Sequence, residues 1–175
     1  AEAGRGQREL VEMDPATGTI TRTVFRIPGR DIFGPVVSPD GRLLGAAYLR
    51  DGLMVTEYFG ADDEALRRRL ARSFPGKNVH IAQRNADRTR MILMVAASDQ
   101  PMQMYYFDAT LSQASLVSEN APWLSGRTFA AAQALRVPTA DGHEIEAFVT
   151  LPPNARGKVP LIVMPHGGPV GITDL

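Results

Sequence analysis

Apolar and polar residues alternate in short runs along the first 118 residues, and turn residues separate the runs. Alternation of this kind is typical of strands with one buried face, and Asp-Gly or Pro-Gly pairs between runs mark turns. The sequence predicts strands at residues 9–14, 19–27, 33–38, 42–49, 53–59, 78–83, 90–97, 102–108 and 113–118. So many short strands at regular spacing favour an antiparallel all-β architecture.

Residues 62–74 depart from the alternation and predict one helix. Apolar side chains recur there at helical spacing, and three acidic residues occupy the first turn, where the helix dipole favours negative charge. Asp62 is the predicted N-cap, and Pro75-Gly76 ends the helix. The run Arg67-Arg68-Arg69 is interpreted as the solvated face of this helix rather than a binding patch, because the flanking acids balance its charge.

Turn residues recur at a spacing of 47 residues. Asp87 follows Asp40 by this interval, and Asp108 follows Asp14 by 94 residues, twice the interval. Four-stranded blades of β-propellers recur at roughly 40–50 residues, so the spacing agrees with a propeller, and a generic β-meander is the plainer interpretation. The chain would then hold about two to three blades, fewer than the four to eight that usually close a ring.

A glycine turn follows an apolar run near the C-terminal end. Residues 161–164 are wholly apolar and bounded by prolines, which predicts a strand buried on both faces. His166-Gly167-Gly168-Pro169 comes next. Paired glycines leave backbone N–H groups accessible to a ligand because no Cβ blocks the approach. The plainer interpretation is a strand that ends in a Gly-Pro turn.

A hairpin and a linker precede this turn. Asp141-Gly142 separates two extended runs within residues 135–153, and such a pair is the strongest short-range hairpin signal. Alternate apolar residues from Ile145 to Leu151 fall on one face of the second run. Residues 119–127 lack a strand pattern and predict a linker. Trp123 within it and Phe129 just after it are expected to be packing residues.

This ordered set resembles the start of the hydrolase domain in the prolyl oligopeptidase family of serine peptidases, especially its acylaminoacyl-peptidase-like and dipeptidyl-peptidase-like branches. The matching residues are Asp141-Gly142, residues 147–153 and residues 160–169. The resemblance therefore covers roughly the last forty residues. Val170 departs from it, since some members have a second histidine at this position.

The resemblance implies a mainly β chain in two incomplete parts. Residues 1–125 would form a partial β-propeller with one inserted helix, and residues 126–175 the first strands of an α/β-hydrolase domain. Gly167 and Gly168 would supply backbone donors to an oxyanion hole, with His166 and Pro169 as structural parts of the turn. The whole protein would hydrolyse short peptides through an acyl-enzyme, and its propeller would exclude large folded substrates.

The chain lacks the nucleophile that such chemistry requires. A serine hydrolase of this fold carries Ser on a G-x-S-x-G elbow, followed by a carboxylate and a histidine. None of the seven serines has glycine at both flanking positions, so by the resemblance the triad lies beyond Leu175. We therefore expect a fragment that is inactive alone. An esterase of the same fold and a non-catalytic β-rich interaction module are the alternatives.

The composition limits the classes of partner that the chain is expected to bind. Apolar residues make up 44% and charged residues 22%, which is typical of a globular chain. Because 19 basic and 19 acidic side chains cancel, no charge surplus favours nucleic acid or an anionic membrane. The longest apolar run, residues 91–97, is too short to cross a bilayer. Open strand edges are expected to invite self-association.

Cofactors are not expected either. The chain has no cysteine, which excludes disulfides and thiolate metal sites but does not choose between the cytoplasm and an oxidising compartment. Its three histidines, His80, His143 and His166, show no spacing typical of a metal site. His80 and His143 are expected to be surface or packing residues.

Overall fold

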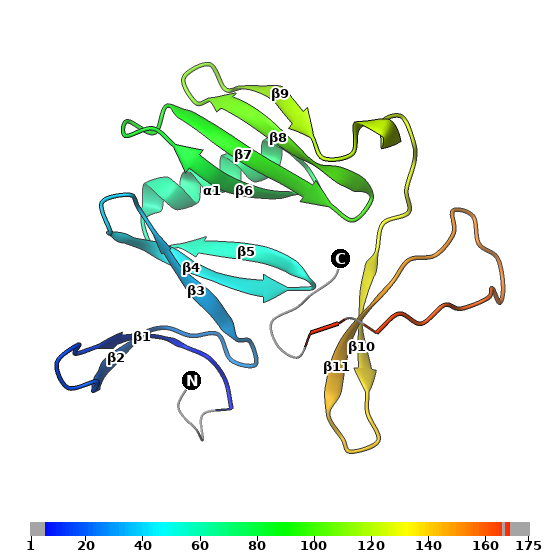
Figure 1. Cartoon of the computed structure of the whole chain (residues 1–175), viewed down its shortest axis with the longest axis horizontal. Coiled ribbons are helices and arrows are strands. Elements are labelled where there is room, and N and C mark those ends of the chain that lie inside the picture. Colours follow the sequence, from blue (N-terminus) through cyan, green and yellow to red (C-terminus); the bar gives the residue numbers. More distant parts are fainter. Residues whose placement is uncertain (1–5, 166, 169–175) are drawn as a thin grey trace. The chain divides into compact units, whose positions relative to one another are not determined.

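The computed structural model describes residues 6–165, 167 and 168 (Figure 1). The described chain is mainly β, as the alternation predicts: strands hold 46% of it and helices 10%, so strands provide nearly all the regular structure. Its antiparallel sheets are open rather than closed. The chain divides into two compact units, residues 1–73 and 74–175.

The first unit joins a hairpin, a three-stranded meander and a helix. In chain order its elements are β1 (Leu10–Met13), β2 (Ile20–Phe25), β3 (Ile32–Val37), β4 (Leu43–Arg50), β5 (Leu53–Tyr58) and α1 (Ala61–Ser73). β1 pairs with β2, and β4 is the central strand of β3-β4-β5. The core forms around Ile32, Ala46 and Tyr48, against which side chains from β1 and β2 pack.

The second unit contains a four-stranded meander and a separate hairpin. Its elements are β6 (Asn78–Arg84), β7 (Arg90–Ala97), β8 (Gln100–Asp108), β9 (Gln113–Glu119), the short 3-10 helix η1 (Pro122–Leu124), β10 (Gln133–Pro138) and β11 (Glu144–Val149). The sheet runs in the order β6-β7-β8-β9, and β10 pairs with β11. Met91, Leu93, Val95 and Phe107 are almost fully buried. The predicted boundary between residues 125 and 126 falls just after η1.

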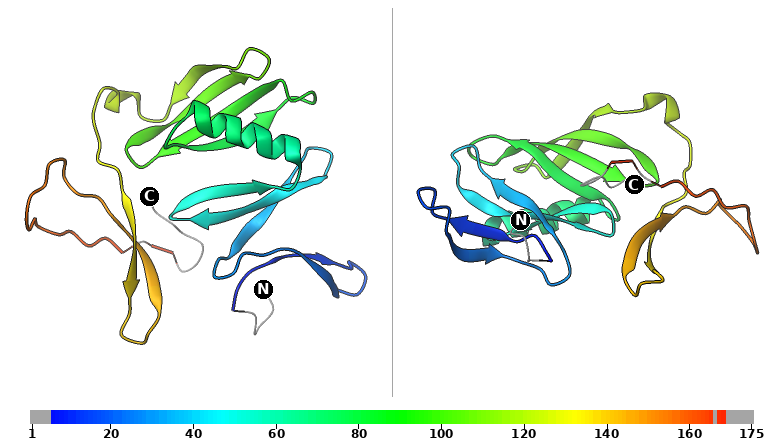
Figure 2. Two further views of the ribbon diagram at one scale, coloured as in Figure 1. Left: turned by 180° about the vertical axis from the view of Figure 1, so that it is seen from behind. Right: turned by 60° about the horizontal axis from the view of Figure 1, so that its bottom comes forward.

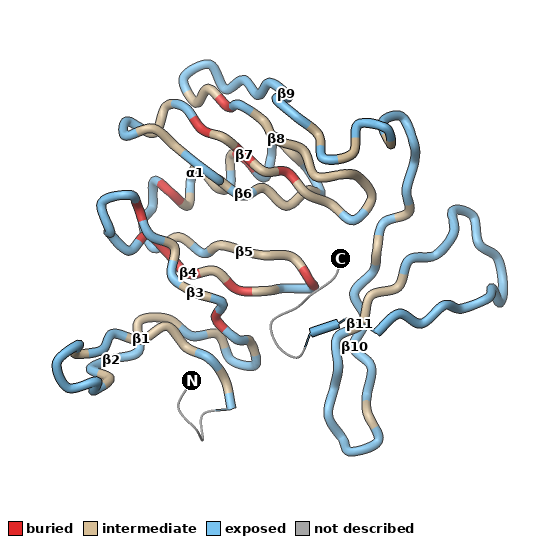
Figure 3. Tube along the Cα trace, viewed as in Figure 1, coloured by how far each residue is buried: buried red, intermediate tan, exposed pale blue. Residues whose placement is uncertain are grey.

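The 47-residue spacing recurs in the strands themselves. β4 begins at Leu43 and β7 at Arg90, and β5 begins at Leu53 and β8 at Gln100, in both cases 47 residues apart. The buried residues follow the same interval along the two central strands (Figure 3). The equivalent buried pairs are Leu44 and Met91, Ala46 and Leu93, and Tyr48 and Val95. The two meanders therefore bury the same positions of their central strands.

The turns repeat in detail as well. The N–H of Gly41 donates to the carbonyl of Ser38 at 2.8 Å, and 47 residues later Arg88 donates to Asn85 at 3.1 Å. Both donors have positive φ, 81° and 59°. Such φ values favour glycine, so the turn at Arg88 holds a non-glycine residue in a conformation that its repeat partner adopts without strain.

A second pair of turns is separated by twice this interval. The Oδ1 of Asp14 accepts the N–H of Ala16 at 2.8 Å, and the Oδ1 of Asp108 accepts the N–H of Thr110 at 2.9 Å. Four residues after each aspartate the chain has positive φ, at Gly18 and Ser112. The spacing noticed in the sequence thus marks turns of the same construction, in which an aspartate caps its own backbone.

The first meander has a helix where the second has its fourth strand. β9 begins at Gln113, and the position 47 residues earlier lies inside α1. Figure 2 shows this helix from two further sides. The prediction of a helix here is confirmed, with a start at Ala61. The predicted N-cap is wrong: Asp62 lies within the first turn, because the carbonyl of Gly60 already accepts the N–H of Glu64 at 3.0 Å. Glycine is an acceptable residue at this cap.

The nine strands predicted within residues 9–118 are confirmed, and so is the hairpin around Asp141-Gly142. The prediction of a buried strand at residues 161–164 is wrong, because these residues form no strand and their side chains are 77–84% exposed. A strand buried on both faces requires sheet neighbours and covering layers, and no described strand pairs with this run.

The predicted packing of Trp123 is also wrong. Its side chain is 75% exposed, and that of Phe129 is 38% exposed. Trp123 belongs to η1, a single turn closed by the N–H of Leu124 on the carbonyl of Ala121 at 2.9 Å. Connecting segments of this kind run over a protein surface, so they offer an aromatic ring little to pack against.

Candidate functional site

The predicted oxyanion turn is described only at its two glycines. Gly167 and Gly168 are both exposed, and a Cβ added at Gly167 would meet no atom within 4 Å. Gly168 has φ of 127°, a backbone conformation that side chains rarely adopt. His166 and Pro169 lie outside the described residues. Both glycines are therefore exposed residues, and their predicted role as donors stays a prediction.

No serine of the described chain is paired with a histidine. The hydroxyl of Ser98 accepts the N–H of Ala132 at 2.9 Å, and that of Ser38 accepts the N–H of Arg42 at 3.1 Å. The side chains of His80 and His143 make no hydrogen bond within the residues that the structure describes. Nucleophilic catalysis needs a hydroxyl and a base within hydrogen-bonding reach, and this part of the chain brings no such pair together.

The aspartates that carry the repeat are structural. Hydrogen bonds from the Thr110 hydroxyl and the backbone of Leu111 lower the pKa of Asp108. A hydrogen bond from the Thr89 hydroxyl lowers the pKa of Asp87 in the same way. At both positions the carboxylate accepts the N–H of the residue two positions later and closes a turn. Within the described residues, no cluster of three or more histidine, aspartate or glutamate side chains could hold a metal ion.

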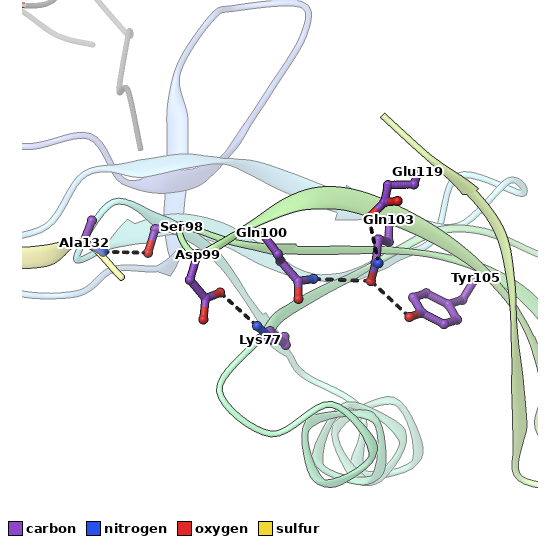
Figure 4. A network of polar contacts seen from close by, with 8 residues as sticks. All are labelled: Lys77, Ser98, Asp99, Gln100, Gln103, Tyr105, Glu119 and Ala132. Atoms are coloured by element: carbon purple, nitrogen blue, oxygen red, sulfur yellow. Dashed lines mark hydrogen bonds and ion pairs between the residues drawn. The ribbon is translucent and has the colours of Figure 1, made fainter. Parts of the chain in front are cut away.

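A polar network crosses one end of the four-stranded sheet (Figure 4). The Oε1 of Gln103 accepts the hydroxyl of Tyr105 at 3.0 Å, and its Nε2 donates to Glu119 at 3.1 Å. Lys77 pairs with Asp99 at 2.9 Å nearby. Because Gln103 uses both ends of its amide within the sheet, its hydrogen bonds tie β8 to β9.

A second group of polar side chains surrounds α1, and sequence reasoning missed its extent. Arg67 donates to Glu64 through Nε at 2.7 Å and Nη2 at 2.6 Å, and Arg68 donates to the same carboxylate at 2.9 Å. The hydrogen bond from Arg67 is the largest cause that lowers the pKa of Glu64 to about 2. Glu64 in turn raises the pKa of Arg67.

Strand residues complete this group. Tyr48 and Arg50 of β4 line a pocket together with Glu64, Arg67 and Arg68 of the helix. The spacing of Glu64 with Arg67 and Arg68 is visible in the sequence and predicts helical ion pairs. The sequence does not show that Tyr48 and Arg50 of β4 belong to this group, because their position depends on how the helix turns back beside the strands.

Comparisons of the chain with protein-family models, with curated protein sequences and with solved structures found no match. Among the described residues, no helix is both long and apolar enough to span a membrane.

Proposed function

We propose that the chain is part of a serine peptidase of the prolyl oligopeptidase family. Residues 1–125 form part of its β-propeller, and residues 126–175 begin its α/β-hydrolase domain. The observation that supports this proposal is the repeat, because two meanders bury equivalent positions 47 residues apart. The hairpin β10-β11, which belongs to the region that resembles the family, follows these meanders.

The four-stranded antiparallel meander β6-β7-β8-β9 has the strand number and order of a propeller blade. β3-β4-β5 repeats its first three strands, and α1 replaces the fourth. The β1-β2 hairpin corresponds to the last two strands of a preceding blade, since its turn matches the β8-β9 turn at Asp14 and Asp108. In a propeller, neighbouring blades cover the faces of each blade. The open sheets of this chain agree with such an arrangement.

In this proposal Gly167 and Gly168 donate backbone N–H groups to the oxyanion of an acyl-transfer transition state. Removal of one such donor typically costs roughly 3 kcal/mol of transition-state stabilisation. The triad comes from residues that are not in this chain.

The substrate of the whole protein would be a short peptide, cleaved through an acyl-enzyme. The glycine turn alone does not separate amide from ester substrates, so an esterase of the same fold is the nearest alternative. A non-catalytic interaction module is favoured by a different observation: Leu116 and Val117 on the edge strand β9 are 54% and 59% exposed. An exposed apolar edge is a template for self-association or for a partner strand.

The coding sequence beyond Leu175 tests the proposal. We expect a G-x-S-x-G elbow within roughly a hundred residues, then an aspartate and a histidine. A stop codon directly after Leu175 would refute the peptidase and favour the interaction module. The 175-residue chain itself should hydrolyse neither peptide nor ester substrates in a fluorogenic assay. Turnover that a serine-directed phosphonate abolishes would contradict the assignment of the triad to other residues.

A further inference from the structure

A polar pocket of about 340 Å³ opens in the first unit between the β4-β5 hairpin and α1. Its size lies within the range of ligand pockets, which is roughly 300–1,000 Å³. Strand residues Tyr48, Arg50 and Thr56 and helix residues Glu64, Arg67 and Arg68 are among those that line it. The proposed catalytic function does not use this pocket.

The charges of the pocket leave one guanidinium unmatched. Glu64 holds both Arg67 and Arg68, and the other acid in the lining is Glu57. Three arginines therefore face two carboxylates. Arg50 makes no side-chain hydrogen bond or ion pair within residues 6–165, 167 and 168. Arginine binds carboxylates with geometry that favours two parallel hydrogen bonds, so an unpaired arginine in a pocket favours an anionic group.

Tyr48 supplies a second donor. The residue is only 6% exposed, but its hydroxyl is not fully buried and has no hydrogen-bond partner among the described residues. Tyrosine combines an apolar ring that packs in a core with a polar tip that can donate to a partner. Tyr48 and Arg50 are two residues apart on β4, so they lie on the same face of the sheet. An acceptor that enters the pocket can therefore reach both donors.

The outer edge of β5 lies beside the same pocket. Asp51 and Gly52 have φ of 52° and 75°, the two-residue turn that makes Arg50 and Leu53 a hydrogen-bonded pair. The alternation of an antiparallel ladder then directs the N–H and C=O of Met54 and Thr56 away from β4. In agreement, the N–H of Phe59 donates to the carbonyl of Leu44 at 2.9 Å. No described strand pairs with this edge.

We propose that an extended peptide segment pairs with the edge of β5 and places an acidic side chain in this pocket, where Arg50 and Tyr48 bind its carboxylate. Pairing along a strand edge supplies main-chain hydrogen bonds, and a side pocket supplies specificity. A peptide residue opposite Val55 directs its side chain to the face that carries Tyr48, because cross-strand neighbours share a face. The proposal does not depend on the peptidase assignment.

The probe is a fluorescein-labelled, C-terminally amidated heptapeptide, Thr-Val-Thr-Glu-Thr-Val-Thr, whose glutamate is its only acid. The matched peptide carries glutamine at the same place. Fluorescence anisotropy with the 175-residue chain measures both affinities. We expect the glutamate peptide to bind about tenfold more tightly, as a charged hydrogen bond predicts. Equal affinities, or no binding of either peptide, would overturn the proposal.

Three variants separate the two parts of the site. Arg50→Gln should remove the preference for glutamate while the glutamine peptide binds as before. Arg42→Gln is the matched control, an exposed arginine on the turn before β4, and should change neither affinity. Thr56→Pro removes an N–H that does not belong to the β4 ladder, so the sheet should persist in circular dichroism. It should weaken both peptides at least about tenfold. A preference that survives Arg50→Gln, or binding that survives Thr56→Pro, would refute the site.

Discussion

The meanders β3-β4-β5 and β6-β7-β8-β9 form their buried faces at equivalent positions but with different side chains. Both bury three alternate residues of the central strand at equivalent positions. At the middle position the first has Ala46 and the second Leu93, each with no exposed surface. The neighbouring position, on the other face, holds Gly45 in the first and Ile92 in the second. The repeat is thus conserved in position rather than in volume.

The difference shows where each sheet obtains its stability. Around the small Ala46, side chains from outside the meander complete the core: Leu10, Phe25 and Ile27 pack against it. In the second meander the central strand itself provides the bulk, through Met91, Leu93 and Val95. Substitutions at paired positions should therefore have unequal effects on the two units.

Leu93→Ala should give the largest loss. The side chain is fully buried, so its truncation removes apolar contacts and leaves a cavity, at a cost of about 3.5 kcal/mol in unfolding free energy. Urea unfolding followed by circular dichroism measures the change. Ile92→Ala is the control, because this half-buried neighbour lies on the opposite face of the same strand and should cost about 1 kcal/mol. Equal losses for the two variants would contradict the assignment of the buried face.

Gly45→Ala should give the next largest loss, in the first unit. A Cβ at this position would lie 2.2 Å from the carbonyl oxygen of Glu57, a backbone atom that cannot move without disturbing the β4-β5 ladder. We expect a loss of about 2.5 kcal/mol from this overpacking. Gly34→Ala in β3 is the control, since its Cβ would meet nothing within 4 Å. If Gly45→Ala unfolds at the same urea concentration as Gly34→Ala, the close approach of the strands is wrong.

Much of this architecture could be predicted because its signals are local. Period-two alternation locates the strands, and the acidic first turn with apolar residues at helical spacing locates α1. The aspartate spacing indicated the repeat, because the aspartates close turns through hydrogen bonds to residues two positions away. Such features depend on a few neighbouring residues, so a single sequence contains them.

The failures depend on distant residues. An apolar run such as 161–164 becomes a buried strand only if other strands flank it, and no local signal reports whether they do. Gly45 is not visible as a close contact either, because the carbonyl of Glu57 reaches it only through the register of two strands. The same holds for Tyr48 and Arg50 beside α1. Predicting the pocket required knowledge of where the helix returns to the sheet.

The last difference between the two meanders is their fourth element, and Glu64 tests what holds α1 in place. Its pKa is lowered from 4.5 to about 2, chiefly by the hydrogen bond from Arg67. Because the folded state resists protonation of this carboxylate, the stabilisation is fully present above about pH 4.5 and is lost as pH falls through about 2. Glu64→Gln should cost about 1 kcal/mol at pH 7, less than the full shift implies, since both arginines are partly exposed.

Unfolding free energies of the wild-type and Glu64→Gln chains at pH 7, 4.5, 3 and 2 measure this contribution. The difference in unfolding free energy between the two chains should become smaller only below about pH 4.5. Glu12→Gln is the matched control in the β1-β2 hairpin. Glu12 pairs with Arg22 at 2.6 Å, but both side chains are more than half exposed, so the loss should stay within a few tenths of a kcal/mol. A gap for Glu64→Gln that does not change with pH would mean that packing, rather than the shared carboxylate, holds the helix in place of a fourth strand.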